Sequence, residues 1–257
     1  ALDFSNPNTQ SASYYDFDID TSNKAEGLDI HYVFNRTDEV FFNHTDLSGT
    51  YGQVVCGYCS NVSVTNVTFG TEGLYFVYSS NSTIQNITSD TNSGNALTLQ
   101  DSDDMLVNDS TILADGYNGI DVTGDRVSIT NNLVNVSGSF SPAGINFGYF
   151  NEDSDVVVVT DNMIIASGAE ATVRMDTVVG ANFTDNTITN NGVNQEALYL
   201  ASDVLDSTFS RNNYTSSTND NGVVYSRQAS NNTFRDERIN ATGSGACVYL
   251  ADGGSSI

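Results

Sequence analysis

The segment IDVTGDRVSITNNLVNVSGSFSPAGINF, residues 120–147, contains one full unit of an internal repeat and the start of the next. The unit opens with an apolar–polar alternation at residues 120–122, passes through a polar turn, alternates again and ends in Asn-rich residues. Such alternation predicts half-buried β-strands, and no unit shows the 3.6-residue apolar period of a helix. The segment therefore predicts short strands joined by tight turns.

Similar units run along most of the chain. They start at Leu74, Ala96, Ile120, Ile145, Thr172, Leu198, Val223 and Cys247, with spacings of 22, 24, 25, 27, 26, 25 and 24 residues. An earlier unit begins near Gln53, and a degenerate one begins near Leu28. Because units so alike can bury their apolar faces only against their neighbours, the repeat favours a solenoid over a sandwich.

Alternation in the opening strand of each unit predicts which side chains face the core. The expected inward pairs are Leu74/Phe76, Ile120/Val122, Ile145/Phe147, Leu198/Leu200 and Val223/Tyr225, with Leu97/Leu99 and Val173/Met175 in two units shifted by one residue. A one-residue shift exchanges the two faces of a strand, so the register of each unit decides the outcome. Small or turn-forming residues precede these strands and predict tight corners: Gly73, Asn95, Gly119, Gly144, Ala171, Ala197, Gly222 and Ala246.

A second periodic feature consists of asparagines that each follow a large apolar residue by three positions. They are Asn132, Asn162, Asn186 and Asn212. Stacked at one corner of a solenoid, their amides would hydrogen-bond along the axis as a ladder. We expect a structural role for these four residues.

The fragments NVSVTNVTF (61–69), NSTIQNIT (81–88) and ANFTDNTITNNG (181–192) resemble those of right-handed parallel β-helix repeat proteins. They are most similar to the NosD-like, carbohydrate-binding-and-hydrolase type repeats of archaeal surface proteins. The resemblance covers about residues 28–257 and implies an all-β, single-stranded right-handed parallel β-helix of nine to ten rungs, each of 22–27 residues. Because that fold hosts lyases, hydrolases, viral tailspikes, adhesins and surface-layer components, it implies no single function.

Two regions are predicted: an N-terminal extension at residues 1–26 and the β-helix at residues 27–257. Within the extension, SYYDFDID (13–20) alternates aromatic or apolar residues with acids and predicts one strand. That strand would cap the first rung or pair with a neighbouring copy, since an open solenoid end exposes unpaired backbone. Because the chain starts at Ala1 without a signal peptide, we expect a processed chain or a fragment.

The composition is strongly acidic, with 32 Asp+Glu against 8 Lys+Arg in 257 residues and a formal net charge of −24. Such a chain repels phosphates, so no nucleic-acid partner is expected. No apolar run reaches the roughly 18–20 residues that span a bilayer. Of the acids 25 are Asp, and Lys24 is the only lysine. This balance fits a salt-adapted, halophile-like surface, and equally an ordinary acidic secreted protein.

Acceptor sequences for N-glycosylation are about twice as frequent as the roughly 6–7 expected by chance. They start at Asn35, Asn43, Asn61, Asn66, Asn81, Asn86, Asn108, Asn135, Asn182, Asn213, Asn231 and Asn240. If some carry sugar, the protein is extracytoplasmic. The alternative is that the Asn/Thr turn chemistry of the repeat produces the excess without any glycan.

One outward cluster is a candidate for catalysis. Asp121, Arg174, Asp176 and Tyr199 are expected on the outward face of the opening strand in nearby rungs. Two acids about 5–9.5 Å apart beside an aromatic ring could hold and cleave a sugar. The motifs of polygalacturonase-like and pectate-lyase-like enzymes are mostly missing, and outward acids arise by default in so acidic a chain. A surface role is therefore favoured for the cluster, while Tyr75 and Tyr199 remain candidates for stacking on carbohydrate.

Acidic residues also collect in the turn after the opening strand. Asp101, Asp103, Asp104, Asp153 and Asp155 have spacings compatible with Ca²⁺, which takes about six to eight oxygen ligands. A solvated acidic edge is the favoured interpretation, calcium is the alternative, and no other cofactor is expected. In Cys56-x-x-Cys59 we expect a local disulfide, because zinc and redox settings are missing. Cys247 is then expected either to be a buried small residue or to pair with a cysteine outside this segment.

These features favour a non-enzymatic extracellular structural glycoprotein: a surface-layer, sheath or fibre component that assembles through β-helix packing. The alternatives are a polysaccharide lyase or glycoside hydrolase, and a glycan-binding adhesin or viral spike. The expected partners are copies of itself, surface glycans, or both. The expected location is the cell surface or, for a spike, the virion surface.

Overall fold

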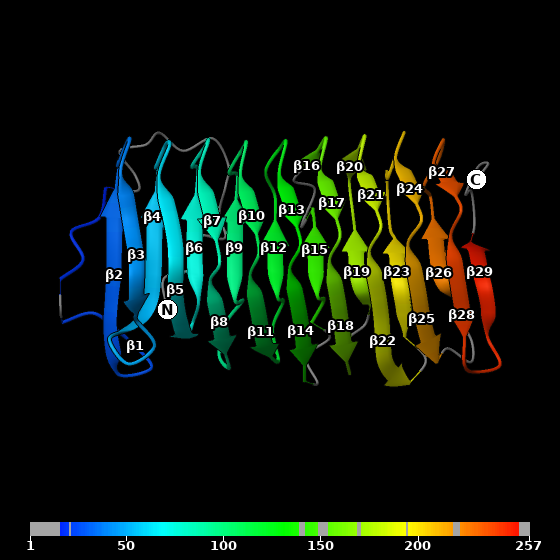
Figure 1. Cartoon of the computed structure of the whole chain (residues 1–257), viewed down its shortest axis with the longest axis horizontal. Coiled ribbons are helices and arrows are strands. Elements are labelled where there is room, and N and C mark those ends of the chain that lie inside the picture. The colour runs from blue at the N-terminus through cyan, green and yellow to red at the C-terminus, as the bar shows by residue number, and fades with distance from the viewer. Residues whose placement is uncertain are drawn as a thin grey trace.

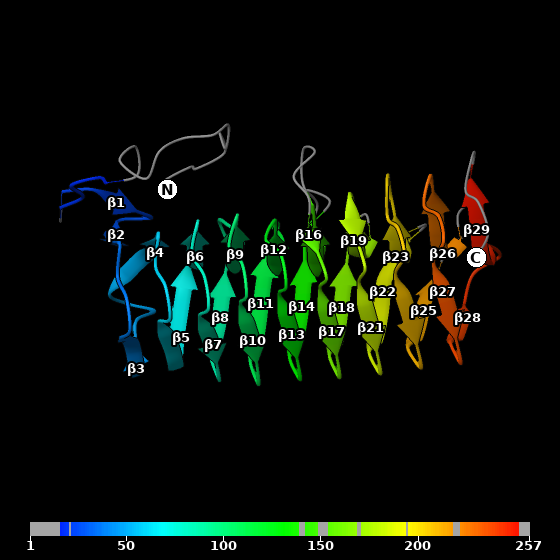
Figure 2. The same cartoon turned by 90° about the horizontal axis from the view of Figure 1, so that it is seen from above.

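In a computed structural model of the chain, every regular element among the described residues is a β-strand. The structure describes residues 16–20, 22–138, 142–148, 154–168, 171–193, 195–217 and 222–251. Successive turns follow one another in sequence order along a single long axis (Figure 1), and the view from above shows the same succession (Figure 2). Within these ranges no helix could cross a bilayer. The prediction of an all-β solenoid is confirmed.

One sheet, here called sheet A, takes one strand from each turn. Its strands, in spatial order, are β1 (Lys24–Ala25), β2 (Leu28–Phe34), β4 (Tyr51–Gly57), β6 (Leu74–Val77), β9 (Leu97–Gln100), β12 (Ile120–Val122), β15 (Ile145–Phe147), β19 (Ala171–Met175), β23 (Glu196–Leu200), β26 (Gly222–Arg227) and β29 (Ala246–Ala251). From β2 to β29 all neighbours pair in parallel. The ten parallel strands correspond to about nine turns.

A second sheet, here called sheet B, has two arms that meet at β5 (Ser63–Thr71). One arm contains β7 (Thr83–Gln85), β10 (Leu106–Asn108), β13 (Ser128–Thr130), β17 (Val158–Thr160), β21 (Asn182–Thr184), β24 (Thr208–Ser210) and β27 (Thr233–Arg235). The other contains β8 (Thr88–Thr91), β11 (Thr111–Asp115), β14 (Leu133–Ser137), β18 (Met163–Ser167), β22 (Thr187–Val193), β25 (Asn213–Ser217) and β28 (Arg238–Ala241), while β3 (Val40–Asp46) also pairs with β5. A short pair, β16 (Ser154–Asp155) and β20 (Val178–Val179), lies outside both sheets. Most turns therefore have three main strands, one in sheet A and one in each arm of sheet B.

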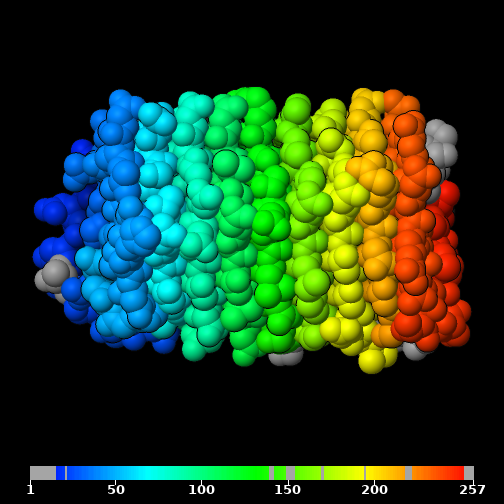
Figure 3. Space-filling view, in the orientation of Figure 1, coloured from blue at the N-terminus to red at the C-terminus, as the bar shows by residue number. Residues whose placement is uncertain are grey.

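The core is a continuous apolar column, and neighbouring turns pack as adjoining bands on the surface of Figure 3. The inward pairs predicted for β6, β9, β12, β15, β19 and β23 are all buried, which confirms them. The pair Val223/Tyr225 is wrong in its second member. Leu198 pairs with Val224 and Tyr199 with Tyr225, so Tyr225 points outward. Val223 and Val224 are both buried, and two adjacent valines conceal the register from the sequence.

The asparagine ladder is present inside the corner between the two arms of sheet B. Each Nδ2 donates to the Oδ1 of the next member: Asn132 to Asn162 (3.0 Å), Asn162 to Asn186 (3.0 Å) and Asn186 to Asn212 (2.9 Å). Each backbone N–H donates to the same oxygen at 2.9 Å. All four side chains are buried, so their amides satisfy one another and the backbone of the preceding turn. The predicted structural role is confirmed.

Glu237 occupies the next position of this ladder and receives hydrogen bonds from the backbone N–H and the Nδ2 of Asn212. Burial raises the pKa of Glu237 from 4.5 to about 7, although those hydrogen bonds act in the opposite direction. The unfolded chain ionises this group near pH 4.5, whereas the folded chain retains the proton to about pH 7. Stability that Glu237 contributes at low pH is therefore lost as the pH rises through this window.

We expect Glu237→Gln to remove this pH dependence. The uncharged Gln Oε1 can still accept from Asn212. The free energy of unfolding of the variant, relative to that of the parent, should therefore rise by about 1 kcal/mol from pH 5 to pH 8. This figure is smaller than the pKa shift alone would give, because solvent screens a partly exposed group. Urea unfolding of both proteins across that range measures the difference. Since every other acid is common to both, a constant difference at all pH values would contradict the assignment.

The outer side of the corner between the two arms is a column of residues with left-handed backbone. Their φ angles lie between 52° and 59°: His44, Asn66, Asn86, Asp109, Asn131, Asp161, Asp185, Arg211 and Asp236. Asn and Asp tolerate this conformation better than most residues, which accounts for the Asn-rich ends of the units. At the corner before sheet A, a Cβ on Gly119 would lie 2.6 Å from the carbonyl oxygen of Gly144. The predicted tight corner is confirmed there.

The start of the chain differs from expectation. Residues 16–20 form no strand, and residues 13–15 of the predicted strand lie outside the described residues. The carboxylate of Asp20 accepts the backbone N–H of Ser22 (2.9 Å), a turn that leads into β1. Strand β1 then pairs antiparallel with the edge strand β2, so the strand on this edge is β1 rather than residues 16–20.

Candidate functional site

The outward side chains of sheet A form one continuous row along the axis. Register fixes its members as Tyr32, Val55, Tyr75, Thr98, Asp121, Asn146, Arg174, Tyr199, Tyr225 and Tyr249. Parallel strands stack about 4.8 Å apart, so successive members of the row are close enough to touch. The row divides into an aromatic cluster near β2–β6, a polar centre, and an Arg–Tyr segment near β19–β29.

The Arg–Tyr segment is a chain of ring contacts. The Arg174 guanidinium lies 5.8 Å from the ring centroid of Tyr199. Tyr199 and Tyr225 are 5.1 Å apart, and Tyr225 and Tyr249 are 5.4 Å apart with nearly parallel rings. Tyr225 and Tyr249 therefore cover one another's faces, whereas the Tyr199 ring is tilted by 50° against Tyr225, and the end ring of Tyr249 is 44% exposed. Tyr and Arg are enriched in protein interfaces, because they combine apolar area with hydrogen-bonding groups.

The aromatic cluster at the other end surrounds two valines that point outward from sheet A. Val55 and Val77 are fully buried although they face away from the core. The surrounding side chains are Tyr32, Phe34, Tyr58, Tyr75 and Tyr78. Tyr75, expected as a carbohydrate-stacking residue, is thus half-buried in an apolar cluster. Sequence reasoning missed the other members, whose signal was the recurrence of aromatic residues at and beyond the ends of β2, β4 and β6.

The predicted catalytic residues are brought together only in part. Arg174 lies 3.7 Å from Asp176 and contacts Tyr199. Asp121 belongs to β12, and Asn146 on β15 separates it from Arg174 on β19. The catalytic role of Asp121, Arg174 and Asp176 thus stays a prediction.

Asp121 is held by three amides from three successive turns. Its Oδ1 accepts from the Nδ2 of Asn146 (2.7 Å) and of Asn118 (3.2 Å), and its Oδ2 accepts from the Nδ2 of Asn95 (3.2 Å). Burial raises the pKa of Asp121, while the amide hydrogen bonds favour its ionised form and limit the rise. With both oxygens already accepting hydrogen bonds, Asp121 links neighbouring turns.

The acidic turn is partly neutralised. Arg126 donates from Nε to Asp104 Oδ1 (2.7 Å) and from Nη2 to Asp103 Oδ2 (3.4 Å), and this pairing lowers the pKa of Asp104. Asp103 also accepts the backbone N–H of Asp125 (2.9 Å), and Asp125 that of Asp155 (2.9 Å).

Two other calcium candidates complete this turn. Burial raises the pKa of Asp101, and Asp153 lies outside the described residues. Among the residues with described positions, no group of three or more His, Cys, Asp or Glu is arranged to hold a metal. The calcium site stays a prediction.

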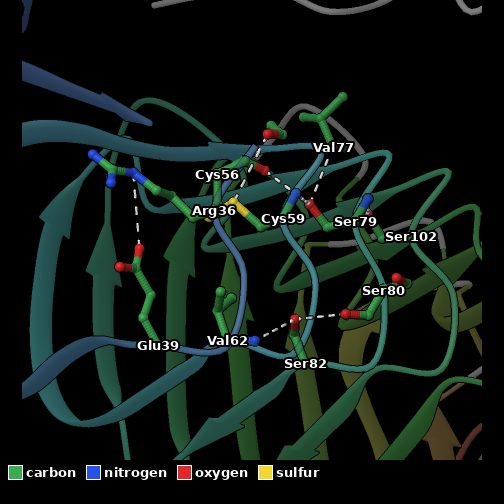
Figure 4. The surroundings of a disulfide bond; sticks show 11 residues. Arg36, Glu39, Cys56, Cys59, Val62, Val77, Ser79, Ser80, Ser82 and Ser102 are labelled. Carbon is green, nitrogen blue, oxygen red and sulfur yellow. Dashed lines mark hydrogen bonds and ion pairs between the residues drawn. A yellow bond between two sulfur atoms is a disulfide. The ribbon is translucent and has the colours of Figure 1, made fainter. Parts of the chain in front are cut away.

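Cys56 and Cys59 form a disulfide across the bend that follows β4, with their Cα atoms 5.8 Å apart (Figure 4). Both cysteines are buried, and the Ser79 hydroxyl accepts the N–H of Cys59 (3.0 Å) while donating to the carbonyl of Cys56 (3.1 Å). Disulfides form and persist mainly in oxidising compartments. Cys247 is an exposed free cysteine, unlike the buried residue that was one of the two expectations for it.

The twelve glycosylation acceptors are distributed unevenly over the surface. None is buried, whereas the ladder asparagines are. Seven lie in strands of sheet B and five in connecting segments, and none lies in a strand of sheet A. Six have left-handed backbone, so turn chemistry accounts for part of the excess: Asn35, Asn61, Asn66, Asn81, Asn86 and Asn231.

Comparison with known proteins agrees with the architecture. The family model for the right-handed β-helix region matches residues 19–154. The A-module of mannuronan C-5 epimerase AlgE4 from Azotobacter vinelandii is 14% identical with a TM-score of 0.57, over 89% of this chain and 77% of that one. Among curated sequences, none matches this chain significantly.

Two further structures are less similar. The surface protein and adhesin PfbA of Streptococcus pneumoniae is 12% identical with a TM-score of 0.45, over 77% of this chain and 68% of that one. The alginate lyase of Paenibacillus sp. str. FPU-7 is 14% identical with a TM-score of 0.44, over 86% of this chain and 99% of that one. At such identities the likenesses concern the fold alone.

Proposed function

Because this chain belongs to the right-handed β-helix family, we propose that it is an extracellular structural glycoprotein that contacts its partners through the outward face of sheet A. The observation that carries this proposal is the placement of the acceptor asparagines. They occur in sheet B and in the connections and are missing from every strand of sheet A. Glycans around the rest of the solenoid would leave this one face open for packing.

Three other observations support the proposal. The open face carries the Arg–Tyr segment, whose residue types favour contact surfaces. The Cys56–Cys59 disulfide suits an oxidising, extracytoplasmic compartment. The net charge of −24 would oppose association at low ionic strength, and salt screens such repulsion. A salt-adapted component of a layer, sheath or fibre combines these properties.

The test compares assembly of the parent with Tyr225→Ser and Arg174→Ala in high salt, by native mass measurement and particle imaging. Truncating a central Tyr or Arg contact costs about 2 kcal/mol or more, so we expect assembly to weaken about 30-fold. Met163→Ser is the matched control, because Met163 is exposed on the outer side of sheet B and distant in register from the row. Assembly that is equally sensitive to Met163→Ser, or insensitive to the sheet A variants, would refute the proposed face.

A second candidate, a glycan-binding adhesin, is favoured by the same Arg–Tyr segment. Phenolic hydroxyls and ring edges arranged along about 14 Å of the axis could follow an extended polysaccharide. If the protein is monodisperse, binds surface glycans and loses that binding on Tyr225→Ser, the result would favour glycan binding over self-assembly as its function.

A further inference from the structure

A surface hollow of about 480 Å³ lies at the corner between the two arms of sheet B, near the first turns. All of its lining residues have polar side chains: Asn43, His44, Thr65, Asn66, Gln85, Asn86 and Asp109. These residues come from four successive turns, so the hollow extends about 14 Å along the axis. Three of them, Asn43, Asn66 and Asn86, are glycosylation acceptors.

The three acceptor amides differ in what their nitrogens do. The Nδ2 of Asn86 donates to Oδ1 of Asn66 (2.5 Å), and the Nδ2 of Asn66 donates to Oδ1 of Asn43 (3.2 Å). Thr65 Oγ1 also donates to that Asn43 oxygen (3.0 Å). Asn43 thus ends the chain as an acceptor, and its own Nδ2 makes no hydrogen bond to the described residues. A glycan joins asparagine through this nitrogen.

Sugar on the three acceptors would have unequal consequences. On Asn66 or Asn86 the first sugar would replace one hydrogen of an Nδ2 that already donates to the adjacent asparagine, so the sugar and that side chain would compete for the same side of the nitrogen. On Asn43 it would leave both inter-turn amide hydrogen bonds in place. The remaining lining supplies Gln85 and Asp109, amide and carboxylate groups that can hydrogen-bond sugar hydroxyls.

We propose that Asn43 carries an N-glycan whose first sugars lie in this hollow, and that Asn66 and Asn86 stay unmodified in the folded protein. This inference rests on the proposed function, because it requires an extracellular glycoprotein. It assigns to the hollow a ligand that the chain itself carries. The glycan would cover the outer side of the corner and connect four turns.

Glycopeptide mapping of the protein from its native source tests occupancy at each acceptor. We expect sugar on Asn43 and none on Asn66 or Asn86. Glycosidase digestion of the native protein should then release the Asn43 glycan at least tenfold more slowly than glycans on open strands such as Asn135. The two rates should become equal after denaturation, because the hollow no longer exists.

Thr45→Val removes the Asn43 acceptor and, by this assignment, should lower the melting temperature of the glycosylated protein. Thr37→Val removes the Asn35 acceptor outside the hollow and should leave the melting temperature nearly unchanged. Both variants are compared with their unglycosylated forms, so any effect of valine itself cancels. Sugar on Asn66 or Asn86, a bare Asn43, or release at the same rate as from Asn135 would overturn the inference while leaving the proposed function intact. Twelve bare acceptors would overturn both.

Discussion

Replacing Asn162 by alanine is expected to destabilise the β-helix by about 3–5 kcal/mol. The side chain of Asn162 donates to the Ile129 carbonyl (2.8 Å) and to Asn186 (3.0 Å), and it accepts from the N–H and the Nδ2 of Asn132. Alanine would leave the backbone N–H and one Nδ2 hydrogen of Asn132 without their buried acceptor. Each such group costs about 1–3 kcal/mol, and local relaxation and water recover part of the total.

The measurement is reversible unfolding of protein produced without glycosylation, where a loss of that size lowers the melting temperature by about 10 °C. Asn135→Ala is the control, because Asn135 is exposed on the neighbouring strand β14 and should change stability by less than about 0.5 kcal/mol. Equal effects at the two positions would mean that the ladder does not contribute to stability.

The ladder illustrates which parts of the fold could be predicted from sequence. A buried amide that pairs with its copy in the next turn must recur at the period of the turn, so Asn132 and Asn162 reveal both the period and the corner. Inward pairs such as Ile120/Val122 were predictable for the same reason, since a core position repeats in every turn. Glu237, which continues the ladder with a different side chain, departs from the pattern and was not predicted.

Outward residues follow no such rule, and here prediction was weaker. Tyr199 was recognised on sheet A, but its contact with Tyr225 depends on the register of β26, where the predicted inward residue was displaced by one position. The separation of Asp121 from Arg174 likewise depends on counting β15 between their strands. Contacts between outward side chains exist only after register is fixed, and adjacent apolar residues leave register open.

The absence of glycosylation acceptors from the outward face of sheet A also could not be predicted from the sequence. Twelve acceptors were visible in the sequence, but the absence of acceptors from one side appears only when residues are assigned to strands. Similarly, Asn43 and Asn86 are far apart in sequence but line one hollow, because they occupy the same corner of the solenoid two turns apart. The candidate contact surfaces are products of the stacking, and their residues carry little local signal.

Gly124→Ala is expected to have a larger effect than the ladder variant and to prevent folding or remove most of the stability. A Cβ at this position would lie 1.9 Å from the carbonyl oxygen of Ser102, 2.5 Å from its carbon and 2.8 Å from its nitrogen. All three atoms are backbone of the preceding turn, so no side-chain rotation relieves the clash. The two turns would have to separate, which would disrupt parallel pairing and core packing around them.

A graded series makes this prediction measurable even if Gly124→Ala does not fold. A Cβ on Gly49 meets nothing within 4 Å, and a Cβ on Gly70 lies 3.3 Å from the Cβ and carbonyl oxygen of Ser48. We therefore expect Gly49→Ala to change stability by less than about 0.5 kcal/mol, Gly70→Ala to cost about 1 kcal/mol, and Gly124→Ala to exceed both by several kcal/mol. Soluble yield, circular dichroism and urea unfolding place the three variants in order. A stable Gly124→Ala protein would mean that these two turns lie farther apart at Gly124 than the 1.9 Å approach between its Cβ and the Ser102 carbonyl oxygen implies.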